Sequence, residues 1–142
     1  MPVRSSSATW NGNLVQGKGT MVVGKGWFEG PFTRASRFEN GEGTNPEELL
    51  GAAHAGCYSM FLSAVLTKSG FPPNTIHTTA KVHIVDGPTI NLIELDVEGD
   101  VPNCDQATFL SHAEQAKAGC PVSKALASVE IKLHAKLKHH PA

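Results

Sequence analysis

The stretch from Leu49 to Thr67 constrains the fold more than any other, because it contains no Asp, Glu, Lys or Arg. Helix signals bound it on both sides. Asn45 is a favourable N-cap, Pro46 suits the first helical position, and Gly70 is followed by two prolines that forbid continuation. A helix without a polar face is buried on every side. The sequence therefore predicts one long helix at the centre of the protein.

An uncharged run of this length also meets the length criterion for a transmembrane helix. We reject that interpretation, because His54, Tyr58, two glycines and two serines weaken the apolar character of the run. No second such run follows it, and we expect no membrane partner. We predict instead a buried helical stripe made of Leu50, Ala53, Cys57, Met60, Phe61 and Ala64. Two pairs of small residues, each four apart, let another backbone approach closely: Gly51/Ala55 and Ala52/Gly56.

The size of the chain sets what surrounds this helix. The 142 residues predict a single domain over 1–142. So short a chain has few elements with which to bury a helix on all sides, so we expect a homodimer. The net charge of −1 argues against a nucleic-acid partner. An odd number of cysteines, three, and a start without an apolar segment predict a cytoplasmic protein rather than a secreted one.

The rest of the chain alternates between strand and helix patterns. Glycine-rich turns separate strands before the helix, over 20–23 and 31–38 among others, and predict antiparallel structure. After the helix, 78–85, 94–101 and 129–137 read as strands, and opposite charges on the last two predict neighbours in one sheet. Asp105 caps a further helix, and Cys120-Pro121 starts a short one. Strand runs separated by helix runs indicate an α+β fold.

The three cysteines differ in what their surroundings predict. Cys120 lies where a helix N-terminus lowers the pKa of a thiol, although an ordinary cap residue is an equal alternative. Cys57 lies in the buried helix, where an isolated cysteine is more often a small hydrophobe. Cys104 follows a loop and is expected to be exposed and incidental. His54 is expected to be a satisfied core histidine, and His139-His140 a solvated tail.

The seven histidines lack the spacing of a metal site, so we expect none. Several segments together, however, resemble the OsmC/Ohr family, and its OsmC branch more than the organic hydroperoxide resistance proteins. The resemblance covers nearly the whole chain. The segments are Arg37-Phe38-Glu39, Gly43-Thr44-Asn45-Pro46-Glu47-Glu48-Leu49, Ala52-Ala53-His54-Ala55-Gly56-Cys57 and Ala116-Lys117-Ala118-Gly119-Cys120-Pro121-Val122-Ser123, with Trp10 and Gly17-Lys18-Gly19 near the start.

The resemblance implies an intertwined α+β homodimer with long central helices flanked by antiparallel sheets. It implies a thiol peroxidase in which Cys57 attacks the peroxide and Cys120 resolves the product as a disulfide, with Arg37 and Glu47 beside the reactive sulfur. It implies organic hydroperoxides as substrates, hydrogen peroxide less well, in defence against oxidative or osmotic stress. No cofactor is expected; a dithiol reductant, such as a lipoylated protein, reopens the disulfide. Cys104 is outside the pattern, and its role is open.

Physical chemistry supports these roles. A buried thiolate needs a positive partner, which Arg37 can supply, and Glu47 can fix that guanidinium bidentately. Glu47 and Cys57 are ten residues apart, about 15 Å along a straight helix. One arginine hardly bridges both, so we predict that Arg37 or Glu47 serves the Cys57 of the other subunit. We expect Met60, Phe61 and Trp27 or Phe28 to line the substrate site. Two alternatives are a redox sensor without turnover and a carrier of an apolar ligand.

Overall fold

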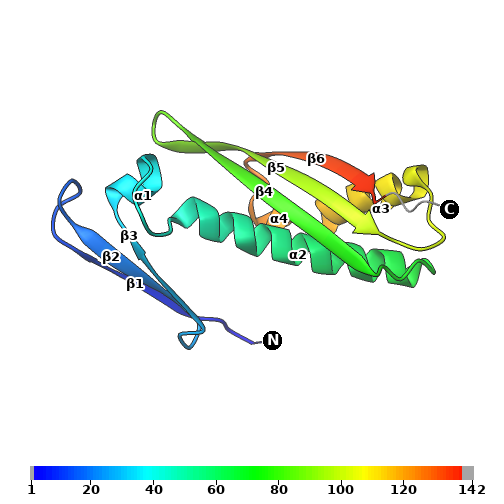
Figure 1. Cartoon of the computed structure of the whole chain (residues 1–142), viewed down its shortest axis with the longest axis horizontal. Helices are drawn as coiled ribbons and strands as arrows, with labels where there is room; N and C mark the ends of the chain where they lie inside the picture. The colour runs from blue at the N-terminus through cyan, green and yellow to red at the C-terminus, as the bar shows by residue number, and fades with distance from the viewer. Residues whose placement is uncertain (1, 139–142) are drawn as a thin grey trace. The chain divides into compact units, whose positions relative to one another are not determined.

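The computed structural model describes residues 2–138 (Figure 1). The chain forms two compact units, one up to Leu49 and one from Leu50 onward. The expectation of a single domain stays a prediction. Both units combine helices with sheets, so the predicted α+β class is confirmed.

The first unit is built on an antiparallel sheet in the order β1-β2-β3. Its strands are β1 (Ser6–Asn11), β2 (Lys18–Val23) and β3 (Phe28–Phe32), followed by helix α1 (Arg34–Phe38). The Trp10 and Phe32 rings pack with centroids 5.3 Å apart over Gly19, where an added Cβ would lie 2.6 Å from the Phe32 ring. The glycine-rich antiparallel start is therefore confirmed.

The strand predicted over 31–38 is wrong beyond Phe32, because a helix begins there. Thr33 is the N-cap of α1: its hydroxyl oxygen accepts from the Ser36 amide at 3.0 Å, while the Ser36 hydroxyl accepts from the Thr33 amide at 2.8 Å. This reciprocal arrangement is a capping box with serine in the place usually held by Glu or Gln. It overrides the local strand propensity and puts Arg37 on a helix.

Helix α2 (Pro46–Lys68) confirms the long helix, and Asn45 caps it by accepting from the Glu48 amide at 2.8 Å. Its buried stripe differs from the predicted one. Beyond its first turn the buried residues are Gly51, His54, Tyr58, Leu62 and Leu66, whereas Met60 is 72 % exposed. A helix without charges has no polar face to mark its phase, so the apolar pattern alone could not show which side meets the sheet.

The opposite side of α2 is exposed within one chain, at Ala52, Ala53, Gly56, Met60 and Ala64. Burial on every side is therefore wrong for the single chain. Within the described residues, α2 is the one helix long and apolar enough to cross a membrane by length and composition, and 28 % of its most apolar window is buried. Core helices of soluble proteins pass the same test.

The second unit has a sheet in the order β4-β5-β6, formed by β4 (Thr75–Val85), β5 (Thr89–Asp100) and β6 (Glu130–Leu137). β4 and β5 are antiparallel, as expected, whereas β5 and β6 are parallel, so the strands of the two sheets are mostly antiparallel. Helices α3 (Gln106–Gly119) and α4 (Pro121–Ala125) form the crossover that a parallel pair requires. α3 packs against β6 (Figure 1).

The core of this unit lies between the sheet and the helices. It contains Tyr58, Leu62 and Leu66 of α2, Ile93, Leu95 and Val97 of β5, and Phe109 and Ala116 of α3. The predicted pairing of oppositely charged strands is confirmed, since Glu98 faces Lys136 across the β5–β6 pair and their side chains lie 3.5 Å apart. Cys120 belongs to this core.

Candidate active site

Two sulfur atoms meet at the edge of the core of the second unit. Cys57 Sγ of α2 lies 2.9 Å from Cys120 Sγ, although the residues are 63 apart in sequence. Cys120 is fully buried, whereas Cys57 is partly exposed, and both are free thiols. Formation of a disulfide requires the sulfurs to move together by only about 0.9 Å. The structure therefore brings together the two cysteines singled out in the sequence.

Cys120 is held at the junction of two helices. Its amide donates to the Ala116 carbonyl at 2.9 Å and ends α3, while its carbonyl accepts from the Lys124 amide at 3.0 Å and begins α4. Pro121 occupies the first position of α4, as predicted. At Gly119 an added Cβ would lie 2.8 Å from the Phe61 ring, so glycine allows α2 to pack against this junction. The backbone thus fixes Cys120 against α2.

The two thiols have opposite pKa shifts. Burial raises the pKa of the Cys57 thiol, and the adjacent Cys120 sulfur raises it further. Burial alone would also raise the pKa of Cys120, but hydrogen bonds from the Cys57 thiol, from the Ser123 amide and hydroxyl, and from the Val122 amide together lower it. These directions favour Cys120 over Cys57 as the place of a negative charge on the pair. A cation beside Cys57 is needed to move the negative charge there.

His54 lies one helical turn before Cys57 and is fully buried. Its Nε2 is 2.7 Å from the Ser123 hydroxyl oxygen, and burial lowers the pKa of the ring, which favours its neutral form. Nδ1 has no hydrogen-bond partner among the residues that the structure describes. The predicted satisfied core histidine is therefore correct for one ring nitrogen and wrong for the other.

Arg37 and Glu47 form a forked ion pair within the first unit. The guanidinium Nε donates to Oε1 at 3.0 Å and to Oε2 at 3.2 Å, and Nη2 donates to Oε1 at 2.7 Å. Glu47 is buried, whereas the Arg37 side chain keeps 35 % of its surface exposed. The predicted bidentate contact is confirmed. One edge of the guanidinium is fixed and the rest remains accessible.

An apolar pocket of about 270 Å³ lies beside this ion pair. It is lined by Trp10, Leu14, Phe32, Thr33, Arg34, Arg37 and Phe38. None of Met60, Phe61, Trp27 and Phe28, which we expected to line the substrate site, borders this pocket, and Met60 and Trp27 are 72 % and 95 % exposed; that expectation stays a prediction. The sequence signal for this pocket is the pair Trp10 and Phe32, on β1 and β3. The strand register shows that they flank Gly19 of β2, and the register cannot be read from the sequence alone.

Cys104 is partly buried and packs against the core, which corrects the expectation of an exposed residue. Burial raises the pKa of its thiol, and Asp105 adds to this effect. Its role stays open. In residues 2–138 no three His, Cys, Asp or Glu side chains are arranged to hold a metal ion. His139 and His140 lie outside the described residues.

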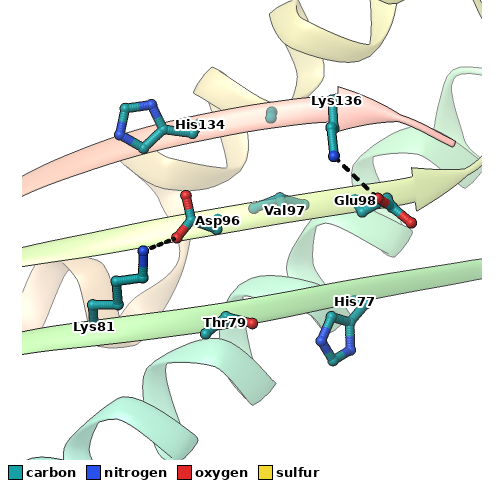
Figure 2. Close-up of a pocket in the computed structure, with 9 residues that line it drawn as sticks. His77, Thr79, Lys81, Asp96, Val97, Glu98, His134 and Lys136 are labelled. Carbon is teal, nitrogen blue, oxygen red and sulfur yellow. Dashed lines mark ion pairs between the residues drawn. The ribbon is translucent and has the colours of Figure 1, made fainter.

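A wider hollow of about 650 Å³ lies on the outer face of β4, β5 and β6 (Figure 2). Ion pairs cross it, from Lys81 to Asp96 at 3.2 Å and from Lys136 to Glu98 at 3.5 Å. These side chains are largely exposed, and such pairs contribute little to stability. The residues around this hollow include neither Cys57 nor Cys120, so the thiol pair is the better candidate.

Comparisons with known proteins agree with these observations. The family model described as OsmC-like protein matches residues 39–134. "Peroxiredoxin OsmC" of Escherichia coli is 46 % identical over 139 residues, covering 95 % of this chain and 96 % of the relative. An "Organic hydroperoxide resistance protein" of Xanthomonas axonopodis is 30 % identical over 86 residues, covering 60 % and 61 %. The crystal structure of an OsmC-like protein from Mycoplasma pneumoniae has a TM-score of 0.75 at 16 % identity, covering 97 % of this chain and 99 % of its own.

Proposed function

Since the chain belongs to the OsmC family, we propose that it is a thiol-dependent peroxidase that reduces organic hydroperoxides, and hydrogen peroxide less well, in defence against oxidative or osmotic stress. One observation carries the proposal: two free sulfurs from distant parts of the chain lie 2.9 Å apart, one of them partly exposed. The name of the relative that is 46 % identical supports the same activity.

The proposed first step oxidises Cys57. Its thiolate attacks the outer oxygen of ROOH, the O–O bond breaks, and ROH leaves with one proton, so that Cys57–SOH remains. The Cys120 thiolate then attacks the Cys57 sulfur, and hydroxide leaves and takes the second thiol proton as water. A disulfide forms with no net change in the number of atoms. A small dithiol, for which we propose a lipoylated protein, reduces it by thiol–disulfide exchange.

The Cys57 thiol needs help to ionise, because its surroundings raise its pKa. We assign this role to the Arg37 guanidinium, a cation that Glu47 orients. Arg37 and Glu47 of one chain are bound to each other. We therefore propose that both residues together serve the Cys57 of a second chain.

The exposed side of α2 supports a homodimer. Its exposed residues include Ala52, Gly56 and Met60, on a helix that carries no charge from Leu49 to Thr67. A second copy of the same helix would remove this surface from water, since an isologous contact pairs the face with itself. We further propose a soluble, cytoplasmic protein. The face of the β4–β6 sheet that points away from α2 carries exposed ion pairs, which are suited to contact with water.

Steady-state turnover tests the function. Peroxide consumption is measured with cumene hydroperoxide and with hydrogen peroxide, each with a lipoyl or a thioredoxin reductant. Continuous consumption with a dithiol, faster with cumene hydroperoxide, supports a peroxidase. Oxidation of one equivalent without turnover indicates the redox sensor. Binding of apolar ligands without thiol oxidation indicates the carrier.

Replacement of Arg37 by alanine is expected to slow peroxide reduction by about 10²-fold or more, because an electrostatic partner of the reacting group is lost. The rate of peroxide reduction is measured together with the rate of Cys57 alkylation as a function of pH. The midpoint of the alkylation profile should move to higher pH. Lys81→Ala is the matched control, since it removes an exposed cation from a different ion pair. A rate and a Cys57 pKa equal to those of the wild type would make Arg37 a surface charge.

A mixed dimer tests whether the site is shared. Chains carrying Cys57→Ser and chains carrying Arg37→Ala are combined. If Arg37 serves the partner's thiol, one of the two sites of each mixed dimer regains all its groups. A purified mixed dimer then has about half of the wild-type activity, and a random equimolar mixture has about a quarter. If all groups come from one chain, mixing leaves at most the slow rate of Arg37→Ala.

We propose that the pocket beside Arg37 holds the organic group of the peroxide. Leu14→Ser is expected to lower kcat/KM for cumene hydroperoxide by about 3- to 10-fold and to leave that for hydrogen peroxide unchanged, because apolar contact area is lost. Leu14 is 62 % exposed, so the change should not unfold the chain. Val15→Ser, at an exposed neighbour that does not line the pocket, is the control. Equal losses for both peroxides would exclude the pocket.

A further inference from the structure

The buried contact between His54 and Ser123 is not used by the steps above, yet it lies against the Cys120 sulfur. Nε2 and the Ser123 oxygen are 2.7 Å apart, and both side chains are buried. Ser123 lies in the first turn of α4, whose N-cap is Cys120, and its hydroxyl contributes to lowering the pKa of the Cys120 thiol. A buried histidine is therefore hydrogen-bonded to a serine at the start of the helix that Cys120 caps.

The protons of this contact can be arranged in only two ways for a neutral ring. If Nε2 carries the proton, it donates to the Ser123 oxygen, and the hydroxyl hydrogen is free to donate to the Cys120 sulfur. Nδ1 is then only an unused acceptor. If Nδ1 carries the proton, Nε2 consumes the Ser123 hydrogen, and a buried N–H is left without an acceptor among the described residues. A buried unpaired donor is the costlier arrangement, so the first is favoured.

We propose that His54 is a positioning residue for the resolving thiol: its Nε2–H fixes the Ser123 hydroxyl so that the hydroxyl hydrogen points at Cys120 and holds that sulfur as a thiolate. The role in catalysis rests on the proposed function. A stabilised Cys120 thiolate attacks the Cys57 sulfenic acid at neutral pH. It is also the better leaving group when a reductant attacks the Cys57 sulfur of the disulfide.

Other ionisable groups also surround this contact. Cys57 contacts Cys120 from α2, and Tyr58 of the same helix donates its hydroxyl hydrogen to the Ala113 carbonyl at 2.9 Å and stays neutral, because burial raises its pKa. The charged side chains Glu114, Lys117 and Lys124 border the hollow that Ser123 also lines, together with the apolar Val129 and Ile131. The charges of these three are the same in all variants below, so differences among the variants report on the hydroxyl itself.

The first test needs no substitution. Long-range ¹H–¹⁵N correlation spectra of the reduced full chain, with the His54 ring assigned by through-bond experiments, report which nitrogen carries the proton. We expect a neutral ring protonated on Nε2 at pH 7. A ring protonated on Nδ1, or an imidazolium at pH 7, would overturn the proposal.

The second test measures Cys120 alone, in the chain with Cys57→Ser and Cys104→Ser. The rate of alkylation by iodoacetamide is followed against pH. Adding Ser123→Ala should move the midpoint upward by about one unit, because one hydrogen bond to a charged group is lost. Ser123→Thr, which keeps the hydroxyl, should restore the midpoint. His54→Gln, whose amide can still donate, should shift it less than Ser123→Ala.

Ser59→Ala is the matched control. Ser59 lies on α2, as His54 does, but its hydroxyl bonds to the Thr78 hydroxyl at 2.7 Å, so its loss should not affect Cys120. An unchanged midpoint in Ser123→Ala, or an equal shift in Ser59→Ala, contradicts the proposal. Neither test uses peroxide. Absence of peroxide consumption by the wild type would therefore refute the function while the assignment of His54 and Ser123 stands.

The effect on turnover follows from the shift. If the alkylation midpoint of Cys120 rises by one pH unit, the thiolate fraction at a pH below the midpoint falls about tenfold. The remaining thiolate is about threefold more nucleophilic, because its pKa is higher. With otherwise intact cysteines, Ser123→Ala should therefore resolve the sulfenic acid about threefold more slowly, seen as more dimedone-trapped Cys57. The rate of the first peroxide reduction should not fall, because a Cys120 with less negative charge raises the pKa of Cys57 less. A slower first step with normal resolution would overturn the assigned role.

Discussion

Replacement of Cys57 by serine is expected to abolish steady-state peroxide consumption, because the attacking thiolate is removed. Cys120→Ser should act differently. Its Cys57 can still reduce one equivalent of peroxide, but the sulfenic acid then has no partner 2.9 Å away and proceeds to sulfinic acid or to mixed disulfides. Mass spectrometry of the intact chain after each equivalent of peroxide separates the two variants.

Cys104→Ser is the control for both changes. Its sulfur is partly buried like that of Cys57 but lies against the Asp105 carbonyl, at 3.5 Å, rather than another thiol. Activity in this variant should match that of the wild type. Full turnover in Cys57→Ser would refute the peroxidase mechanism and favour the carrier of an apolar ligand.

Substitutions at two glycines of α2 are expected to have the second large effect. One of them should reduce the stability of the fold, and the other should prevent dimer formation. An added Cβ at Gly51 meets the Ala80 carbonyl at 3.4 Å and Val82 at 3.5 Å, so leucine there is expected to overpack the contact with the chain's own sheet. The loss should be about 1–3 kcal/mol, with a fall in Tm of about 4 °C per kcal/mol. Thermal unfolding measures it directly.

Gly56 provides the matched case, because an added Cβ there has nothing within 4 Å in the same chain. Gly56→Leu should leave the fold of the monomer intact, since leucine is the better helix former by about 0.8 kcal/mol. If the exposed face of α2 packs on a second copy and the site is shared, this variant should be a folded monomer in light scattering with little activity at any concentration. A fully active dimer would exclude this face as the interface.

The start and end of the long helix, the charged strand pair and the junction at Cys120 were predictable, because each depends on local signals. Asn45 and Gly70 bound α2 through capping chemistry, and alternation places Leu95 and Val97 inside. The side of α2 that meets the sheet was not predictable. Without charged residues the phase is decided by fit against β4, and Gly51 marks the contact only once the strand is in place.

The site was predictable in its residue types but not in its arrangement. The forked pair of Arg37 and Glu47 follows from what guanidinium and carboxylate prefer, yet its position depends on a capping box formed by Thr33 and Ser36 that sequence patterns did not reveal. The link from His54 to Ser123 joins residues 69 apart. Such a contact arises from the crossover between two parallel strands, and no local pattern encodes it.

The separation of 63 positions between Cys57 and Cys120 gives the redox step a consequence for the unfolded chain. A bond between Cys57 and Cys120 would close a loop of that length and remove conformational freedom from the unfolded ensemble, by roughly 4 kcal/mol in the chain-entropy account. Linkage works in both directions, so the folded protein would favour its own oxidised form by the same amount relative to the unfolded chain. Each oxidised molecule would then resist unfolding more than a reduced one, and the reductant must overcome part of the folding free energy to reset it.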